Sequence, residues 1–246
     1  MNRIDDYDEL KNRIVKWIKD YANSNGIQSL VVGVSGGIDS AVVSTLCAET
    51  ELPIFPLGMP IHQDSDQESL SDSHLAWLSK RYKNVKTLKF NLTEVFEQFK
   101  KSLDGYSHDD LALANTRSRL RMVTLYQIAG KYNGLVVGTG NKIEDYGVGF
   151  YTKYGDGGVD IAPIADLYKT EVWELGKYLG VSQKIIDASP TDGLWDDKRT
   201  DEDQLGVPYT SLEQAMEYGT GDGVKVLEKF NKKNQHKMQP IPTFKL

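Results

Sequence analysis

The stretch Val31-Val32-Gly33-Val34-Ser35-Gly36-Gly37-Ile38-Asp39-Ser40 decides the fold of this chain. It begins as a short apolar run, passes through two adjacent glycines and leads into a compact apolar segment at 40–48. The run at 29–34 is typical of a strand buried on both faces of a sheet. Gly36 and Gly37 permit positive φ and a close approach of the backbone to a ligand. We therefore predict a strand, a tight turn and a helix.

The alternation of strand and helix continues along the chain. Further strands are predicted over 53–59, 85–90 and 135–138, and further helices over 7–23, 66–82, 111–129 and 169–179. Trp17, Leu46 and Cys47 are predicted to be core residues. The stretch 147–158 is rich in glycine, 189–209 is polar and loop-like, and 224–237 is a basic helix or tail. This order predicts an α/β fold with a central parallel sheet and helices on both faces. Because no internal repeat or linker interrupts it, we expect residues 1–246 to form one domain.

The composition excludes several classes of protein. The chain has 246 residues, 39% of them hydrophobic, and a formal net charge of −6. An acidic chain is poorly suited to binding nucleic acid over a broad face. The single cysteine, Cys47, excludes a disulfide framework and indicates a reducing compartment. With no apolar run of 18 residues and a polar start, the sequence predicts a cytoplasmic protein without a membrane span or signal peptide.

The turn at Ser35–Ser40 carries the chemistry of an anion site. Backbone N–H groups of such a turn, and those at the start of the next helix, attract phosphate. The hydroxyl groups of Ser35 and Ser40 can add hydrogen bonds. Asp39 would repel phosphate unless a cation lies between them, and Mg²⁺ is the simplest bridge. The turn lacks the Gly-Lys-Ser/Thr ending of a kinase-type phosphate loop and is not a dinucleotide fingerprint.

Other charged residues stand in less decisive settings. Arg117, Arg119 and Arg121 follow helical spacing, and a solvent-exposed helix face is their ordinary role. Lys153 lies in a glycine-rich loop that could close over a substrate. Lys169 is predicted at the start of a helix, which is the unfavourable end for a cation unless an anion is nearby. His62, His74 and His108 lack the spacing of zinc ligands.

These motifs together carry a family resemblance. Ser35-Gly36-Gly37-Ile38-Asp39-Ser40 after a buried strand resembles the pyrophosphate loop of the N-type ATP pyrophosphatases. Three further blocks, Tyr154–Gly158, Ser189–Trp195 and Asp201–Gly206, resemble the ammonia-dependent NAD synthetase family within that superfamily. The resemblance extends from about Leu10 to Pro240. It implies a three-layer, Rossmann-like fold of the adenine-nucleotide-hydrolase type.

The resemblance also implies roles for individual residues. The residues implied to bind ATP are Gly33, Val34, Ser35, Gly36, Gly37, Ile38, Asp39, Ser40, Thr139, Lys169 and Thr191. Those implied to contact deamido-NAD⁺ are Arg119, Lys153, Asp160, His236 and Lys237. Asp39 and Glu144 are implied to hold Mg²⁺, and Asp39 and Lys169 are implied to be catalytic. The family pattern after Thr191 differs here, and Asp192 is left without a role.

The implied reaction has two steps. The nicotinate carboxylate of deamido-NAD⁺ attacks the α-phosphorus of ATP and releases pyrophosphate, and ammonia then displaces AMP to give NAD⁺. A glutamine-using enzyme needs a nucleophilic cysteine, and Cys47 lies in an apolar run, so we expect free ammonia as the nitrogen donor. The resemblance further implies a homodimer. Two alternatives stay open: an N-type pyrophosphatase with another acceptor, and a nucleotide-binding sensor without turnover.

Overall fold

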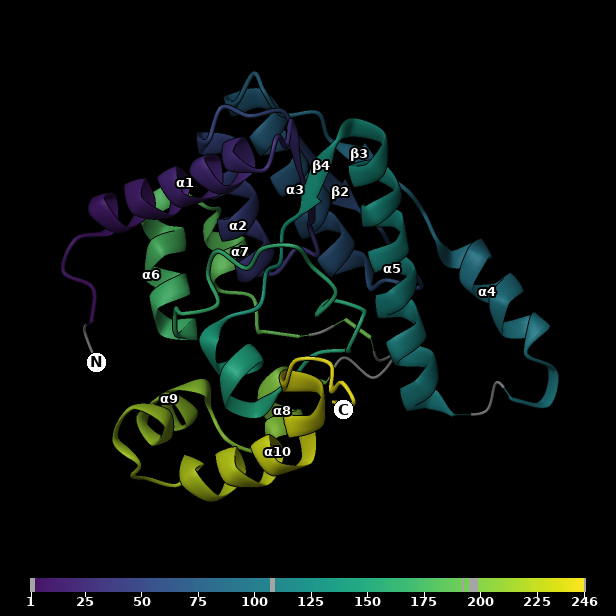
Figure 1. The fold of residues 1–246 in the computed structure, drawn as a ribbon, viewed down its shortest axis with the longest axis vertical. Coiled ribbons are helices and arrows are strands. Elements are labelled where there is room, and N and C mark those ends of the chain that lie inside the picture. The colour runs from purple at the N-terminus through teal and green to yellow at the C-terminus, as the bar shows by residue number, and fades with distance from the viewer. Residues whose placement is uncertain (1–2, 107–108, 192, 195–198, 246) are drawn as a thin grey trace.

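The computed structural model describes residues 3–106, 109–191, 193–194 and 199–245. Its centre is a parallel sheet in the order β3-β2-β1-β4. The strands are β1 (Ser29–Gly33), β2 (Ile54–Gly58), β3 (Leu88–Lys89) and β4 (Gly134–Val136). In the register, Leu30 lies opposite Ile54 and Ser29 lies opposite Gly134. The predicted parallel sheet is confirmed, and β1, which leads into the Ser35–Ser40 loop, is one of its two interior strands. Helices cover the sheet on both sides (Figure 1).

Alternate residues of β1 supply two separate hydrophobic cores. Leu30 and Val32 face one core, which also contains residues of the helices α1 (Tyr7–Ser24), α2 (Ile38–Glu49), α3 (Ser65–Arg81), α6 (Lys169–Leu179) and α7 (Gln183–Ile186). Val31 faces the other core, which α5 (Asp110–Tyr132) covers through Leu125 and Ala129. Successive side chains of a strand point to opposite faces, so one short strand anchors both layers.

The helix α2 is buried around almost its whole circumference. Ile38 and all residues of 40–48 are buried. A helix that is apolar on all sides belongs inside the protein rather than at its surface. The turn that precedes α2 is therefore fixed at both ends by buried structure.

The C-terminal part of the chain forms a helical layer outside the sheet (Figure 1). It contains the π-helix η2 (Ile143–Val148), α8 (Asp201–Leu205), α9 (Tyr209–Tyr218) and α10 (Gly223–Met238). A third core joins these elements, and its buried residues are Ile143, Val148, Tyr168, Leu205, Tyr209 and Leu212. Because Tyr168 immediately precedes α6, this core connects the layer to the helices of the sheet.

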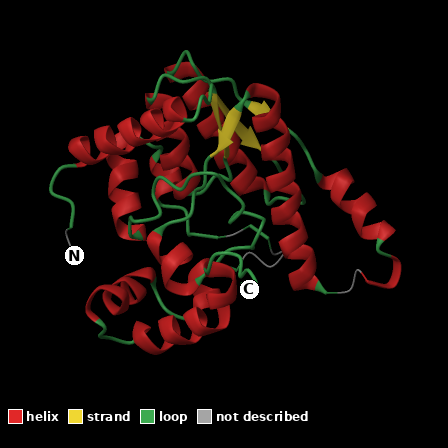
Figure 2. Ribbon diagram, viewed as in Figure 1, coloured by secondary structure: helices red, strands yellow, loops and turns green. Residues whose placement is uncertain are grey.

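Several expectations require correction. α4 (Thr93–Ser102), the 3-10 helix η1 (Asp104–Tyr106) and most of α9 fall where no element was predicted, and α8 lies within the predicted loop 189–209 (Figure 2). β3 is only two residues long, although Val85 adds an isolated bridge to Ile54. Trp17 is 46% exposed, so its assignment to the core was wrong, whereas Leu46 and Cys47 are buried as expected. None of the helices in the described ranges has the length and apolarity that a membrane crossing requires.

Candidate functional site

The loop between β1 and α2 is held in place by hydrogen bonds and by close packing against α3. Gly36 has φ of +95°, and a Cβ there would lie 2.6 Å from the carbonyl oxygen of Gln67 on α3. Only glycine fits this position. The Ser40 hydroxyl accepts from the Ser35 N–H at 3.1 Å and donates to the Gly37 carbonyl at 2.9 Å. No side-chain hydrogen bond caps α2 at Gly37, so the helix start can receive an anionic ligand.

A cluster of opposite charges lies beside this loop. The Lys169 ammonium, at the first residue of α6, is 2.7 Å from Asp39 Oδ2 and 3.1 Å from Glu144 Oε1. Asn141 donates to Asp39 Oδ1 at 3.1 Å. Asp39 belongs to α2, Glu144 to η2 and Lys169 to α6. Residues separated by up to 130 positions in the sequence therefore meet at one point. The two carboxylates explain why a lysine is tolerated at the start of α6, which is the unfavourable end of a helix for a cation.

Burial governs the electrostatics of this cluster. The Lys169 side chain is 2% exposed. Burial alone would lower the pKa of Lys169, but the nearby carboxylates outweigh it, so the pKa is raised and the ammonium stays charged. Burial raises the pKa of Glu144, against the opposing charge of Lys169. The Tyr209 hydroxyl donates to Glu144 Oε1 at 2.7 Å and lies 3.2 Å from Asp201 Oδ2.

These two carboxylates also suit a divalent cation. Among the residues that the structure describes, no group of three or more His, Cys, Asp or Glu side chains could hold a metal. A pair of carboxylates that converge on one cation is nevertheless what Mg²⁺ uses when substrate phosphates supply its other ligands. Asp39 and Glu144 have this arrangement, since both oxygens lie within hydrogen-bond distance of Lys169 Nζ.

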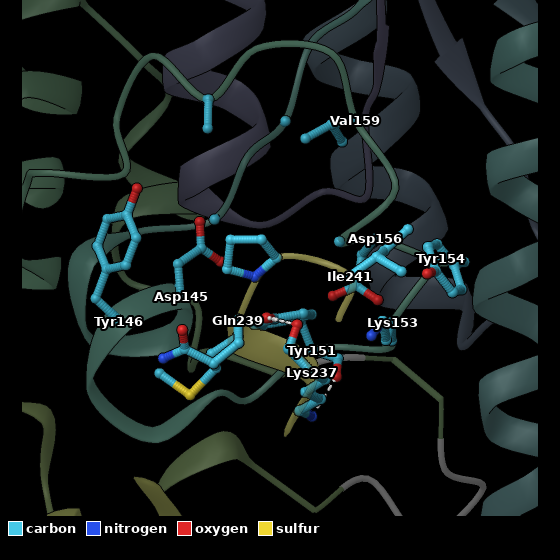
Figure 3. A pocket seen from close by; sticks show the side chains of 16 residues that line it. Asp145, Tyr146, Tyr151, Lys153, Tyr154, Asp156, Val159, Lys237, Gln239 and Ile241 are labelled. Carbon is cyan, nitrogen blue, oxygen red and sulfur yellow. Dashed lines mark hydrogen bonds between the residues drawn. The ribbon is translucent and has the colours of Figure 1, made fainter. Parts of the chain in front are cut away.

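A second cluster of polar groups surrounds a cavity of about 290 Å³ (Figure 3). Lys153, Asp156 and Lys237 line it together with residues 239–241 of the C-terminal segment. The Lys237 ammonium donates to the Tyr151 carbonyl at 2.5 Å, and the Tyr151 hydroxyl donates to the Lys237 carbonyl at 3.0 Å. This reciprocal pair joins the end of α10 to the loop that follows η2, and so fixes one wall of the cavity.

Asp156 is a structural carboxylate of the glycine-rich loop. One of its oxygens accepts from the Ser118 hydroxyl at 2.7 Å and from the Thr152 N–H at 3.0 Å. Burial raises the pKa of Asp156, while these hydrogen bonds lower it. The loop is therefore ordered around its aspartate and tied to α5 through Ser118.

Asp145 lines the same cavity without such support. No hydrogen bond to its carboxylate is found within the described ranges, and burial, followed by the charge of Glu144, raises its pKa to about 7. A Cβ on Gly140 would lie 2.2 Å from Asp145 Oδ1, so the carboxylate rests directly on the backbone of a glycine. A buried carboxylate that faces a cavity is a candidate for ligand contact.

The other predicted site residues are distributed around these two clusters. Arg119 approaches the Lys153 carbonyl at 3.3 Å, so the structure brings these two residues together. Both oxygens of Asp160 are used internally, by the Tyr126 hydroxyl at 2.9 Å and the Val136 N–H at 2.7 Å. His236 is exposed on α10, next to Lys237.

Two further predicted residues lie on loops. Thr139 follows β4 in sequence. Thr191 accepts from the Gly193 N–H at 3.2 Å. Asp192, His108 and Trp195 lie outside the described residues.

Two arginines have more contacts than the sequence indicated. Arg117 donates to the Leu194 carbonyl at 2.8 Å and lies over the Phe96 ring. Arg121 donates to the Met59 carbonyl and to Gln63 Oε1, both at 3.0 Å. The prediction that these two residues lie on a solvent-exposed helix face is therefore wrong, because they connect α5 to the loops at 59–63 and 193–194.

Sequence reasoning missed Asp145, Tyr209 and Arg3. Arg3 pairs with Glu171 at 2.7 Å, two residues after Lys169, and its guanidinium lies 4.4 Å from the centre of the Tyr168 ring. None of the three lies in a segment with a recognisable motif. The only sequence feature that could have indicated one of them is the position of Asp145 directly after Glu144, in a stretch without periodicity.

Comparison with known proteins places the chain in a family. The model of the NAD synthase family matches residues 10–241. The chain belongs to the NAD synthase family. It is 38% identical over 236 residues to an NH(3)-dependent NAD(+) synthetase of Carboxydothermus hydrogenoformans, covering 94% of this chain and 95% of that protein. An enzyme of the same name from Alkaliphilus metalliredigens is 39% identical over 243 residues, which cover 94% of this chain and 96% of that protein.

Solved structures of the NAD synthase family support the fold. The structure of NMN synthetase from Francisella tularensis superposes with a TM-score of 0.89 at 33% identity, covering 98% of this chain and 99% of that one. The NH3-dependent NAD synthetase from Campylobacter jejuni, in complex with the nitrate ion, superposes with a TM-score of 0.79 at 26% identity, covering 98% and 100%. The two proteins are named for different products, NMN and NAD, and share one fold.

Proposed function

We propose that this chain is an ammonia-dependent NAD⁺ synthetase that adenylates deamido-NAD⁺ with ATP and then amidates it. The observation that carries the proposal is the meeting of Asp39, Glu144 and Lys169 beside the Ser35–Ser40 loop. This arrangement provides charge compensation where pyrophosphate would leave. Family membership over residues 10–241 supports the same activity and supports treating 1–246 as one catalytic unit.

The protein's own groups have defined tasks in the first step. The loop from Gly33 to Ser40 would bind the phosphates of ATP through its N–H and hydroxyl groups. Lys169 would neutralise charge that develops on the departing pyrophosphate, from a position already fixed by Asp39 and Glu144. Thr139 and Thr191 would contact the rest of ATP. Because the substrate carboxylate is itself the nucleophile, positioning supplies most of the rate enhancement.

Magnesium fits the same cluster. Asp39 and Glu144 would hold Mg²⁺ with oxygens of ATP as its remaining ligands, and the ion would add positive charge at the leaving group. Both carboxylates already converge on one cation, the Lys169 ammonium.

The cavity lined by Lys153, Asp156 and Lys237 is the proposed site for the nicotinate nucleotide. Lys153 and Lys237 line it, and Arg119 and His236 are close in sequence or space to these lysines. The positive charges of the two lysines and of Arg119 suit phosphate groups of the acceptor. Asp160, whose oxygens are engaged with Tyr126 and Val136, would contribute by fixing the loop around this site.

The nitrogen donor is proposed to be free ammonia. Cys47 is fully buried, and burial raises the pKa of its thiol, so it is unsuited to attack glutamine. The same reduced cysteine supports the cytoplasm as the compartment. A homodimer also remains part of the proposal, and sedimentation of the active enzyme would test it.

A second candidate acceptor is nicotinic acid mononucleotide. The superposition with an NMN synthetase, at a TM-score of 0.89, favours it. The cavity of about 290 Å³ is also just below the range for small-molecule sites, about 300–1,000 Å³, which favours the smaller acceptor. The chemistry of the two steps would be the same, and the acceptor would only lack the adenosine monophosphate half of deamido-NAD⁺.

One assay decides between the acceptors. Purified protein with ATP, Mg²⁺ and ammonium chloride receives either deamido-NAD⁺ or nicotinic acid mononucleotide, and NAD⁺, NMN, AMP and pyrophosphate are quantified. We expect kcat/KM to be higher for deamido-NAD⁺, with AMP and pyrophosphate formed in equal amounts. A higher kcat/KM for the mononucleotide would establish the second candidate, and no AMP with either acceptor would refute both. Lys169→Met serves as the inactive control.

A further inference from the structure

The helix α9 presents one face to the start of α6. Tyr209, Glu213 and Glu217 recur every four residues, so their side chains lie on one side of the helix. The Glu213 carboxylate accepts from the Thr170 N–H at 2.9 Å and from the Thr170 hydroxyl at 2.8 Å. The Glu217 carboxylate accepts from the Tyr168 hydroxyl at 2.8 Å. Two side chains of α9 thus hold the residues on either side of Lys169.

Tyr209 reaches the charge cluster itself. Its hydroxyl donates to Glu144 Oε1 at 2.7 Å, the same oxygen that accepts from Lys169 at 3.1 Å. The Lys169 ammonium lies 4.8 Å from the centre of the Tyr209 ring. The phenol therefore contacts both a proposed magnesium ligand and the proposed phosphate-binding lysine.

The side chain of Tyr209 has little freedom to move. It is fully buried, and its ring lies edge-to-face with Trp173, with ring centres 6.4 Å apart. Its backbone N–H donates to Glu202 Oε1 at 2.9 Å. The hydroxyl is consequently a fixed donor, and a phenylalanine would leave the ring in place while removing that donor.

We propose that Tyr209 is a positioning residue that orients Glu144 and Lys169 for the metal and ATP, with α9 as its rigid support. The proposal rests on the proposed function, because it assigns Glu144 to the metal. Hydrogen bonds that orient a metal-binding carboxylate matter about as much as a ligand: their loss typically costs 10–100-fold in metal affinity or activity. A role in packing alone would predict lower thermal stability with unchanged metal affinity.

The test measures metal binding directly. Mn²⁺ replaces Mg²⁺, and its dissociation constant is determined by electron paramagnetic resonance in the presence of α,β-methylene-ATP, which cannot be cleaved between the α- and β-phosphates. Tyr209→Phe is expected to weaken Mn²⁺ binding about 10–100-fold. The matched control is Tyr82→Phe. The Tyr82 hydroxyl also donates to a carboxylate, that of Glu49 at 2.6 Å, but Glu49 is at the opposite end of α2 from Asp39. Tyr82→Phe should bind Mn²⁺ as the unmodified chain does.

The outcomes separate this inference from the proposed function. Equal Mn²⁺ affinity of Tyr209→Phe and the unmodified chain would overturn the positioning role while leaving the function intact. An unmodified chain that binds no Mn²⁺ would overturn the metal site, and the positioning role with it. Should Tyr209→Phe fail to fold, Glu213→Gln probes the same support through Thr170. It is expected to weaken Mn²⁺ binding by less than Tyr209→Phe does, and unchanged binding would count against α9 as the support.

Discussion

Two neighbouring sets of half-buried carboxylates, the pair Asp39 and Glu144 and the single residue Asp145, differ in how their charges are compensated. Asp39 and Glu144 share the Lys169 ammonium and accept further hydrogen bonds from Asn141 and Tyr209. Asp145, adjacent to Glu144 in sequence, faces the cavity and receives no hydrogen bond from the described part of the chain.

In the proposed function, this difference would separate the charge-compensating cluster from the contact with the acceptor. Dipoles and charges fixed before the reaction stabilise developing charge without reorganising at that moment. A carboxylate without a partner destabilises the folded state, because burial disfavours its charge. Such a group is retained most readily where a ligand completes its hydrogen bonding. In the proposed function, Asp145 would gain its hydrogen bonds from the bound acceptor, whereas Asp39 and Glu144 already have theirs within the protein.

Lys169→Met should have the largest effect. It removes the cation shared by Asp39 and Glu144 and leaves two buried carboxylates facing each other. Breaking a buried pair in this way costs about 3–5 kcal/mol of folding free energy. Loss of the charge at the leaving group should lower kcat by about 10²–10³-fold. Denaturant unfolding and steady-state assays measure the two effects.

The control for this change is Lys16→Met, at an exposed i,i+4 pair with Asp20. Exposed pairs of this kind contribute little, so both measurements should stay near those of the unmodified chain. Equal effects of Lys16→Met and Lys169→Met would contradict the contrast between the two positions.

Asp145→Asn should have the next largest effect. Whereas Lys169→Met should destabilise the folded protein, Asp145→Asn should stabilise it at high pH. The folded pKa of about 7 lies above the unfolded value of 3.8, so the folded state holds more protons between these values and stability falls as pH rises through this window. The loss is at most on the order of 4 kcal/mol. An asparagine does not ionise, so this loss of folding stability at high pH disappears and the melting temperature at pH 8 should rise. The KM for the nicotinate nucleotide should increase, because the carboxylate that faces the cavity is gone. A lower melting temperature at pH 8 would show that the carboxylate has a stabilising partner.

His74→Gln gives the corresponding test for a buried base, with a smaller effect. His74 is buried against Ser44, and burial lowers its pKa to about 4 from 6.5. The unfolded state therefore binds more protons in this window, and stability falls as pH drops from 6.5 to 4, by on the order of 3 kcal/mol. The slope opposes that of Asp145. The Gln variant should lose less stability over this range than the unmodified chain, and identical slopes by denaturant unfolding at pH 4.5 and 6.5 would refute the assignment.

The sheet was predictable because its strands are short, apolar and separated by clear turns. The loop at Ser35–Ser40 was predictable for the same reason, since a local pattern of residues fixes its conformation. The sequence did not predict α9, because the polar stretch before Tyr209 carries no recognisable signal for the start of a helix. Trp17 was misplaced because helical spacing identifies an apolar face but not how completely a neighbour covers it.

The candidate site was predictable only where motifs mark it. Asp39, Glu144 and Lys169 were named from sequence, but their common contact depends on the packing of α6 against α2 and on Glu144 of η2 reaching Lys169, which no local pattern reports. Tyr209 lies 65 positions after Glu144 and has no motif of its own. The partners of Arg117 and Arg121 were missed likewise, because they are backbone carbonyls of distant loops.

The burial of α2 has a consequence for motion. Amide hydrogens of a helix enclosed on every side exchange with solvent only when the whole domain opens, so those of residues 40–48 should be among the slowest in the protein. The Ser35–Ser40 loop is joined to that helix, and at Gly36 it lies so close to the backbone of α3 that no side chain would fit between them. In the proposed function, ATP would therefore bind to a loop that is held by slowly exchanging, buried structure.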